Sequence, residues 1–269
     1  MRARPHAALL LLACAASALH TCVGNGAPHP PMTRVLCYGD SLTAGFWDGG
    51  ARFHPYAAQL SRRLGGCTVD HIGLSGFTSA QMADTLGRTE NKTGGDIDAT
   101  RRRWMSLDEA LERARYTHVV ILAGTNDLSR LRHAGGTRTA ADVVSNIAAL
   151  HTRALASGAR TLALTVPQPA FESLHPQMAL GRGEINAGLR VFAAATANVS
   201  LCELEVALPH LNGTAEERAR LWDDGLHLTP AGYDVLGDAV YGALLDAGAT
   251  PCGSSTSAGE ALEVRRTTS

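Results

Sequence analysis

Short apolar runs rich in β-branched residues alternate along the chain with longer segments in which apolar residues recur at helical spacing. This alternation is typical of a parallel sheet covered by helices, because such strands are buried on both faces. We predict strands at 34–38, 68–72, 118–123, 160–166 and 199–204. We predict helices at 55–64, 79–87, 107–115, 140–157, 184–197 and 230–246.

Local signals mark where two of these helices begin. Ser106 with Glu109 three residues later forms the pattern of a capping box, and Thr229 places a cap residue directly before Pro230. The strand–helix order predicts an α/β fold, a three-layer α/β/α sandwich with a mainly parallel five-stranded sheet. In such folds the functional site lies at the carboxyl ends of the strands.

The chain has 269 residues, 45% of them hydrophobic, which is enough for one sizeable core. We expect a single domain over residues 33–248. The polar, glycine-containing segment 88–103 is expected to be a surface insertion, and the tail 253–269 to be disordered.

The N-terminus has the pattern of an export signal. Arg2, Arg4 and His6 precede an apolar run over 7–18, which small residues follow. We therefore predict a signal peptide over 1–24 and a secreted or lumenal protein. The run is shorter than the roughly 20 residues of a spanning helix, so no stable membrane anchor is expected.

Charge and cysteine content narrow the possible partners and cofactors. The formal net charge is -1 and no long stretch is strongly basic, so the footprint of a nucleic-acid binder is missing. The sequence lacks C-x-x-C, H-E-x-x-H and phosphate-loop motifs, so it indicates no metal and no cofactor. Once a signal containing Cys14 is removed, the pairing among the remaining cysteines stays open: Cys22, Cys37, Cys67, Cys202 and Cys252.

Three proline-free sequons begin at Asn91, Asn198 and Asn212. They would accept glycans in a eukaryotic secretory pathway. We predict a secreted glycoprotein, although a single sequon arises easily by chance.

Four polar motifs carry the candidate chemistry, and three of them follow predicted strands. The first, Gly-Asp-Ser-Leu at 39–42, follows the strand at 34–38 and precedes a helix start, where the partial positive charge favours an oxyanion. Taken alone, it is also an ordinary helix cap.

Two further motifs follow the next strands. Gly-Thr-Asn-Asp at 124–127 places Asn126 at a strand end, where its amide can donate to a developing oxyanion. Asn-Asp pairs such as Asn126 and Asp127 are also common in turns. Gly-Leu-Ser-Gly at 73–76 follows the strand at 68–72, and a glycine there lets a backbone N–H approach a ligand closely.

The fourth motif precedes the final helix and contains Asp224 three residues before His227. A carboxylate at this spacing can accept a hydrogen bond from Nδ1–H and orient Nε2 toward a nucleophile. A surface or structural histidine is the alternative. The neighbouring Asp223 lacks the Asp-x-x-His spacing, so we assign the role to Asp224.

These four motifs, in this order, resemble those of the SGNH (GDSL) hydrolases, a family named for a Ser, a Gly, an Asn and a His. The form of the first motif is most similar to the arylesterase and lysophospholipase-like branch of that family. The resemblance covers most of the predicted domain and implies a flavodoxin-like SGNH fold. It implies Ser41 as nucleophile, with Asp224 and His227 completing the triad. The N–H groups of Ser41 and Gly76 and the Asn126 side chain would form the oxyanion hole. Gly73 could replace Gly76 as the donor.

The resemblance implies two-step acyl transfer through an acyl-enzyme, without a cofactor. We expect a secreted serine esterase for short-chain or aryl esters, or for a lysophospholipid. A carbohydrate acetyl esterase is the main alternative, and an inactive secreted binding protein on the same fold is a second one. The acyl specificity and the oligomeric state cannot be read from the sequence.

Overall fold

The computed structural model of the protein describes residues 32–87, 105–132 and 135–253. The predicted signal peptide, the predicted insertion at 88–103 and the tail beyond residue 253 lie outside these residues. Within them, five parallel strands form one sheet in the order β4-β1-β5-β6-β7. The strands are β1 (Arg34–Gly39), β4 (Thr68–Gly73), β5 (His118–Leu122), β6 (Arg160–Leu164) and β7 (Val199–Cys202).

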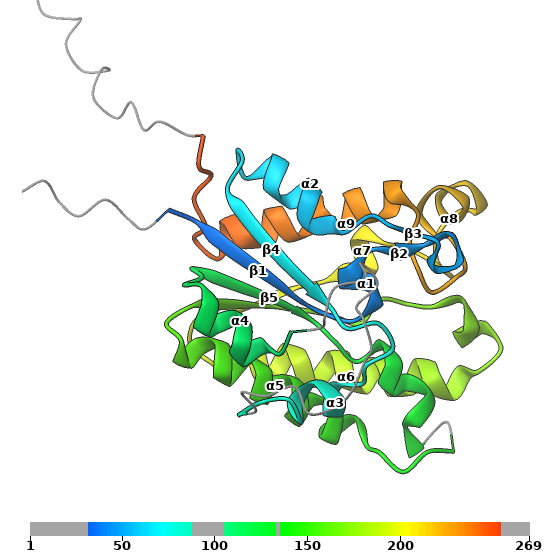
Figure 1. The fold of residues 1–269 in the computed structure, drawn as a ribbon. Coiled ribbons are helices and arrows are strands. Elements are labelled where there is room, and N and C mark those ends of the chain that lie inside the picture. The colour runs from blue at the N-terminus through cyan, green and yellow to red at the C-terminus, as the bar shows by residue number, and fades with distance from the viewer. Residues whose placement is uncertain (1–31, 88–104, 133–134, 254–269) are drawn as a thin grey trace, which may run out of the picture. The chain divides into compact units, whose positions relative to one another are not determined.

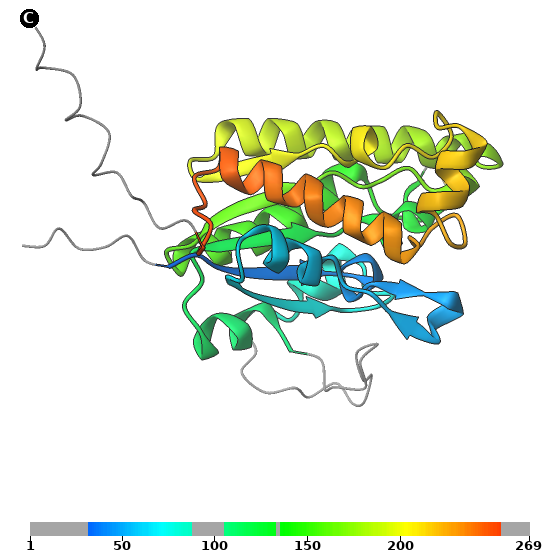
Figure 2. The same cartoon turned by 90° about the horizontal axis from the view of Figure 1, so that it is seen from above.

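Helices cover both faces of this sheet, as Figure 1 shows. One face carries α2 (Tyr56–Arg63) and α9 (Pro230–Asp246), which pack on each other, and Figure 2 shows α9 lengthwise over the strands. The opposite face carries α3 (Ser79–Ala83), α4 (Leu107–Arg113), α5 (Ala140–Ala156) and α6 (Pro176–Ala195). The predicted three-layer α/β/α sandwich with a five-stranded sheet is therefore confirmed.

The central strands explain why the sequence pattern is continuously apolar. In β1, Val35 and Cys37 belong to the core under α2 and α9, whereas Leu36 and Tyr38 belong to the core on the opposite face. Successive side chains of a strand point to opposite faces, so a strand covered on both sides needs apolar residues at every position. All five residues of β5 are buried for the same reason.

Local sequence signals predict the start of some helices correctly and fail to predict the start of others. The Thr229 side chain accepts a hydrogen bond from the Gly232 N–H, and α9 spans the predicted residues. Ser106 accepts from the Glu109 N–H, but the Glu109 carboxylate binds Arg113, so the capping box is incomplete. The helix α6 begins eight residues before the predicted 184, because two early glycines hide its helical pattern.

Several short elements were not predicted. A two-stranded antiparallel sheet, β2 (Phe46–Trp47) and β3 (Arg52–Phe53), encloses the 3-10 turn η1 (Asp48–Gly50). The helices α7 (Leu204–Ala207) and α8 (Ala215–Leu221) follow β7. Because Leu204 already starts α7, β7 ends two residues before the predicted strand end. These elements are too short to show a periodic pattern.

A disulfide joins Cys67, just after α2, to Cys252, beyond α9, with the two Cα atoms 5.3 Å apart. The other two cysteines in the described residues, Cys37 and Cys202, are free and buried. The bond ties the C-terminal segment to the edge of the domain that carries β4.

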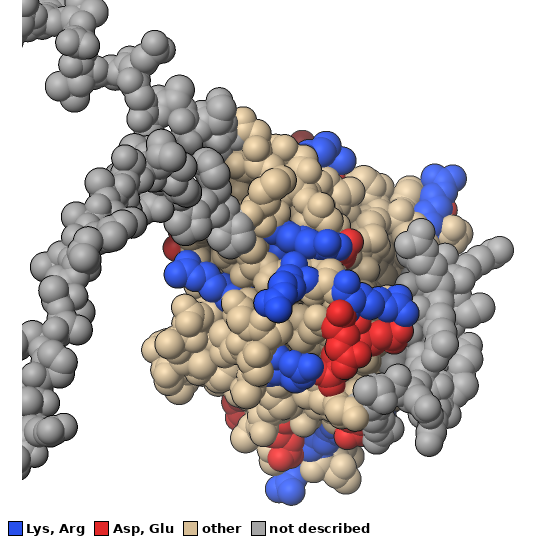
Figure 3. All heavy atoms as spheres, turned by 60° about the vertical axis from the view of Figure 1, so that its left-hand side comes forward, with Lys and Arg blue, Asp and Glu red and all other residues tan. Residues whose placement is uncertain are grey.

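Two properties of the described surface and helices bear on possible partners. None of the described helices is long and apolar enough to cross a membrane. On the face seen in Figure 3, basic side chains lie directly beside a group of acidic ones. That face therefore presents no broad area of a single charge.

Candidate active site

Ser41 lies at the turn between β1 and the short helix α1 (Ser41–Ala44). The preceding Asp40 is the N-cap, and its Oδ1 accepts a hydrogen bond of 3.0 Å from the Leu42 N–H. The cap ends the strand and starts the helix within one residue, at the carboxyl edge of the sheet. The Ser41 side chain is consequently held at a fixed place and is 7% exposed.

A continuous chain of polar contacts runs from Ser41 through His227 to Asp224. The Ser41 Oγ lies 2.9 Å from Nε2 of His227. The Nδ1 atom of the same ring lies 2.8 Å from Oδ2 of Asp224. The structure thus brings these three predicted residues together, although Ser41 and His227 are 186 positions apart.

The loop that carries Asp224 and His227 is closed at both ends. Trp222 and Leu228 form an isolated antiparallel bridge, and the Asp223 N–H donates to the His227 carbonyl at 2.9 Å. Within the loop, Oδ1 of Asp224 accepts from the Leu226 N–H at 2.9 Å and from the His227 N–H at 2.7 Å. One carboxylate oxygen therefore shapes the loop, which leaves the other for the imidazole.

Hydrogen bonding keeps the Asp224 carboxyl in its charged form. Burial by itself would raise the pKa of Asp224, but the hydrogen bonds from the His227 ring and from the N–H groups of His227 and Leu226 lower that pKa below its ordinary value. A charged carboxylate at this place favours the tautomer that carries a proton on Nδ1 of His227.

The adjacent Asp223 has a different task. Its Oδ2 accepts a hydrogen bond of 2.8 Å from the N–H of Asp48 in η1. It therefore joins the histidine loop to the small β2–β3 sheet rather than to the imidazole. This contact agrees with the assignment of the Asp-x-x-His spacing to Asp224.

Phe46 is a site residue that the sequence interpretation missed. Its ring lies 4.3 Å from the His227 ring, centroid to centroid, at 35°. Its carbonyl accepts a hydrogen bond of 2.7 Å from the Tyr233 hydroxyl on α9. Phe46 therefore covers one face of the imidazole and restricts its rotation. Its position just after the Gly-Asp-Ser-Leu motif was the available signal.

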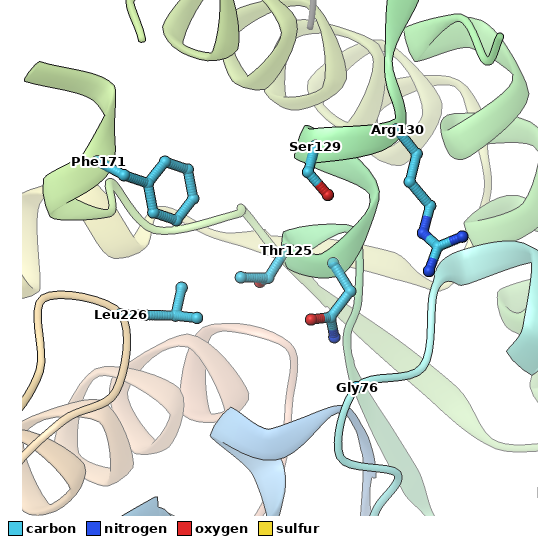
Figure 4. Close-up of a pocket in the computed structure, with 7 residues that line it drawn as sticks. Gly76, Thr125, Ser129, Arg130, Phe171 and Leu226 are labelled. Carbon is cyan, nitrogen blue, oxygen red and sulfur yellow. The ribbon is translucent and has the colours of Figure 1, made fainter. Parts of the chain in front are cut away.

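Asn126 and Gly76 line the same pocket, which has a volume of about 220 Å³. Asn126 belongs to the 3-10 helix η2 (Thr125–Arg130), which follows β5. Its Nδ2 donates to the Phe77 carbonyl at 3.0 Å, so the amide also fixes the turn that contains Gly76. The remaining pocket residues include Thr125, Phe171 and Leu226, as Figure 4 shows.

The two glycines of the 73–76 motif are glycines for different reasons. A Cβ on Gly73 would lie 2.2 Å from the backbone N of Ala44, so this residue allows the end of β4 to pack closely on α1. Gly76 has a φ of +79°, is exposed and faces the pocket, where a Cβ would meet nothing. The structure thus places Gly76, rather than Gly73, beside Asn126.

Two buried carboxyl groups stabilise the turns that carry Ser41 and Asn126. Asp127 accepts from the Ser79 N–H at 2.7 Å and from the Ser79 hydroxyl at 3.0 Å, which fixes η2 to the start of α3. Burial raises the pKa of Asp127 above its ordinary value. Burial raises the pKa of Asp40, the N-cap before Ser41, to about 7, although the hydrogen bond from Leu42 offsets part of that rise.

A buried ion pair anchors the segment opposite the histidine loop. This segment is the 3-10 turn η4 (Ala170–Ser173), whose Ala170 N–H donates to the Gly225 carbonyl at 2.7 Å. Glu172 in the same turn accepts from Arg182 of α6 at 2.7 Å, and its side chain is fully buried. The pair therefore holds both a pocket wall and the histidine loop, and no sequence signal indicated it.

The comparison with protein families identifies the chain as an ester hydrolase. Residues 37–235 match the GDSL-like Lipase/Acylhydrolase family. The chain therefore belongs to this family of enzymes, which confirms the resemblance at the level of the family. No curated protein sequence matches the chain at a significant level.

Solved structures show the same fold. A GDSL-like lipase from Bacteroides thetaiotaomicron is 20% identical, with a TM-score of 0.55 over 80% of this chain and 89% of that one. The protein TesA is 22% identical, with a TM-score of 0.56 over 80% and 99%. A psychrotrophic esterase from a Pseudoalteromonas species is 17% identical, with a TM-score of 0.53 over 80% and 97%. At these identities the likeness concerns the fold.

Proposed function

We propose that the protein is a secreted serine esterase that hydrolyses short-chain or aryl carboxylic esters, or a lysophospholipid, through Ser41, His227 and Asp224. The observation that carries this proposal is the chain of contacts at 2.9 and 2.8 Å that joins the three side chains. In this geometry a base lies within hydrogen-bond reach of the nucleophile, and a carboxylate orients the base.

In the first step, Nε2 of His227 accepts the Ser41 proton as Oγ attacks the ester carbonyl carbon. Asp224 accepts from Nδ1–H and stabilises the imidazolium that forms. The tetrahedral intermediate then expels the alcohol, which takes the proton from His227. An acyl group remains bound to Ser41 through an ester bond.

The oxyanion of this intermediate needs donors on the side of the carbonyl oxygen. We assign this role to the N–H groups of Ser41 and Gly76 and to the second Nδ2–H of Asn126. The first Nδ2–H already binds Phe77, which fixes the direction of the amide before substrate arrives. Fixed donors cost no reorganisation as charge develops, and this is the physical basis of their effect on the rate.

Hydrolysis of the acyl-enzyme repeats these steps with water. His227 removes a proton from water, which attacks the acyl carbonyl carbon. The carbon–Oγ bond breaks, Ser41 regains its proton from His227, and the carboxylic acid leaves.

The pocket favours a small ester. Its volume of about 220 Å³ is below the roughly 300 to 1,000 Å³ of sites for drug-sized ligands. Phe171 and Leu226 give it apolar contact surface. Both features support a short acyl or aryl group at this place.

The decisive experiment compares a series of p-nitrophenyl esters of increasing acyl length with a panel of acetylated glycans. We expect hydrolysis of the short p-nitrophenyl esters, labelling by a fluorophosphonate probe, and loss of both in Ser41→Ala with little change in melting temperature. Labelling of Ser41→Ala at full strength would identify another nucleophile. Activity on the glycans alone would establish the carbohydrate esterase instead, and inactivity on all substrates would favour a binding protein.

Secretion is the second part of the proposal. The disulfide between Cys67 and Cys252 supports it, because such bonds persist mainly in oxidising compartments. Asn198 and Asn212 are exposed, which supports them as glycan acceptors, whereas Asn91 lies outside the described residues. The signal peptide over 1–24 and the domain limits of 33–248 remain part of this proposal.

A further inference from the structure

The pocket beside Asn126 has two unlike sides. In Figure 4, Phe171 and Leu226 lie on one side, and Arg130 lies on the other, with Thr125 between them. A substrate in this pocket therefore meets apolar surface in one direction and a cationic group in the other.

The Arg130 guanidinium is exposed and makes no hydrogen bond or ion pair with the residues that the structure describes; it interacts with Asp127 only through its charge, which lowers the pKa of that carboxyl. Other arginines are paired there: Arg182 binds Glu172, and Arg34 binds Asp70 at 2.8 Å. The backbone of Arg130 is nevertheless fixed, because its carbonyl accepts a hydrogen bond from the Arg138 N–H at 3.2 Å. A fixed backbone with an unpaired cationic side chain at a pocket wall can receive an anion.

The carboxylate of Asp127 is attracted to Arg130 through its charge, but its hydrogen bonds are made elsewhere. Asp127 is fully buried, and both of its oxygens accept hydrogen bonds from Ser79. The Arg130 side chain extends instead toward the loop that carries Gly76, at the edge of the pocket.

We infer that Arg130 selects esters that bear an anionic group, a carboxylate or a phosphate, a short distance from the scissile carbonyl. This inference rests on the proposed function. An ester bound with its carbonyl oxygen at Asn126 and Gly76 has two arms, one on the acyl side and one on the alcohol side. The arms diverge, so one can contact Phe171 and Leu226 while the other reaches the guanidinium.

Arginine suits this task because its planar fork donates two parallel hydrogen bonds to a carboxylate or a phosphate. The effect is limited by solvent, since an exposed ion pair is screened by water and salt. We therefore expect a preference of about 5- to 10-fold in kcat/KM. The alternative is an ordinary solvated arginine, for which anionic and neutral esters would behave alike.

The test uses two substrate pairs that differ in the position of the charge. On the acyl arm, the p-nitrophenyl monoester of adipic acid is compared with the same ester whose second carboxyl group is methylated. On the alcohol arm, 1-butyrylglycerol 3-phosphate is compared with 1-butyrylglycerol. The pair that shows the preference identifies the arm that faces Arg130.

Each pair is measured with the parent protein, Arg130→Gln, Arg130→Lys and Arg132→Gln. The last variant is the matched control, because Arg132 is exposed two residues away, makes a 3.3 Å contact with the Thr137 carbonyl and does not line the pocket. It changes the net charge by the same amount as Arg130→Gln.

We expect Arg130→Gln to remove the preference for one anionic ester and to change kcat/KM for its neutral partner by less than about twofold. Arg130→Lys should keep part of the preference, Arg132→Gln should keep all of it, and 0.5 M salt should weaken it. Equal rates for both members of both pairs in the parent protein would overturn the inference alone. So would equal losses on anionic and neutral esters in Arg130→Gln, or a matching loss in Arg132→Gln. Failure to hydrolyse any of these esters, anionic or neutral, in a Ser41-dependent way would instead refute the proposed function.

Discussion

Asn126 contributes to the site in two ways. Its amide donates to the Phe77 carbonyl at 3.0 Å and lines the pocket together with Gly76. The proposed second donation, to an oxyanion, depends on the orientation that the first one fixes. A side chain used in this way affects the transition state more than the bound substrate.

We predict that Asn126→Ala lowers kcat by about 10² to 10³ and leaves KM nearly unchanged, because the lost bond strengthens only as charge develops. Slower labelling of Ser41 by a fluorophosphonate should remain. The measurement is steady-state kinetics on one activated ester. Full activity in Asn126→Ala would refute the assigned oxyanion hole even if Ser41 and His227 proved essential.

The same substrate tests the orienting carboxylate. Asp224→Asn should leave His227 poorly oriented or in the wrong tautomer, with a loss in kcat as large as about 10⁴. Asp223→Asn is the matched control, since Asp223 binds the Asp48 N–H and not the imidazole. Equal losses in the two variants would contradict the assignment to Asp224.

Asp40 connects the nucleophile turn to the pH dependence of stability. Its pKa is raised to about 7 in the folded protein, above the unfolded value of roughly 3.9. The folded state therefore binds this proton more tightly. The stability that Asp40 contributes is full below about pH 4 and is lost as the pH rises through about 7.

We predict that Asp40→Asn, which cannot titrate, gains stability relative to the parent protein between pH 5 and pH 8. The difference in the free energy of unfolding between the two proteins should change by an amount on the order of a few kcal/mol from pH 5 to pH 8. Urea unfolding of both proteins at the two pH values measures it. Parallel changes in the free energy of unfolding would show that Asp40 does not titrate in this window.

At the scale of elements, the site depends on short turns held by long helices. The turn η4 contacts the histidine loop through Ala170 and Gly225, and it is anchored to α6 by the pair of Glu172 and Arg182. The Arg182 side chain also reaches Glu205 at 3.2 Å. Breaking a buried pair leaves a charge without its partner, which costs more than the pair itself contributes.

We predict that Arg182→Met lowers the free energy of unfolding by about 3 to 5 kcal/mol and also lowers kcat/KM, because Glu172 keeps a buried charge. Adding Glu172→Leu should recover much of the stability. The control is Arg190→Met on the same helix, whose pair with Glu203 is exposed and should contribute no more than about 1 kcal/mol. Equal costs in the two single variants, measured by urea unfolding, would contradict this account.

Sequence patterns predicted the long helix α9 well and several short elements around the site not at all. The helix α9 was predicted to the residue, because Thr229 and Pro230 form a strong local start signal. The β2–β3 sheet and η4 were not predicted, because two to four residues show no period. Their positions come from distant partners such as Tyr233, whose hydroxyl holds the Phe46 carbonyl.

At the scale of the whole molecule, the disulfide joins residues separated by 185 positions in the sequence. It closes nearly the full domain and fits the proposed passage through an oxidising compartment. The two exposed sequons at Asn198 and Asn212 belong to the same proposal.

We predict that the native secreted protein loses apparent mass on treatment with an N-glycosidase. The variant Asn198→Gln/Asn212→Gln should show a smaller shift, and any shift that remains would come from Asn91. Cys67 and Cys252 should react with a thiol reagent only after reduction. Protein found only in a reducing cytosol, without a mass shift, would contradict secretion.

The sequence by itself determined the layers of the fold and the family. Strand and helix periods depend on residues close along the chain, so the five strands of the sheet and the helices α2, α5 and α9 could be predicted from them. The order of the four motifs, through the resemblance they carry, also indicated which side chains to expect at the carboxyl edge of the sheet.

Only the tertiary structure decided which of several equivalent residues meet at the site. Gly73 and Gly76 look alike in sequence, but one packs on Ala44 and the other faces the pocket. The pairing of Cys67 with Cys252 and the position of Arg130 across the pocket from Phe171 also depend on residues far apart in the chain. Such contacts arise from packing in three dimensions, and a local pattern of apolar and polar residues contains no information about them.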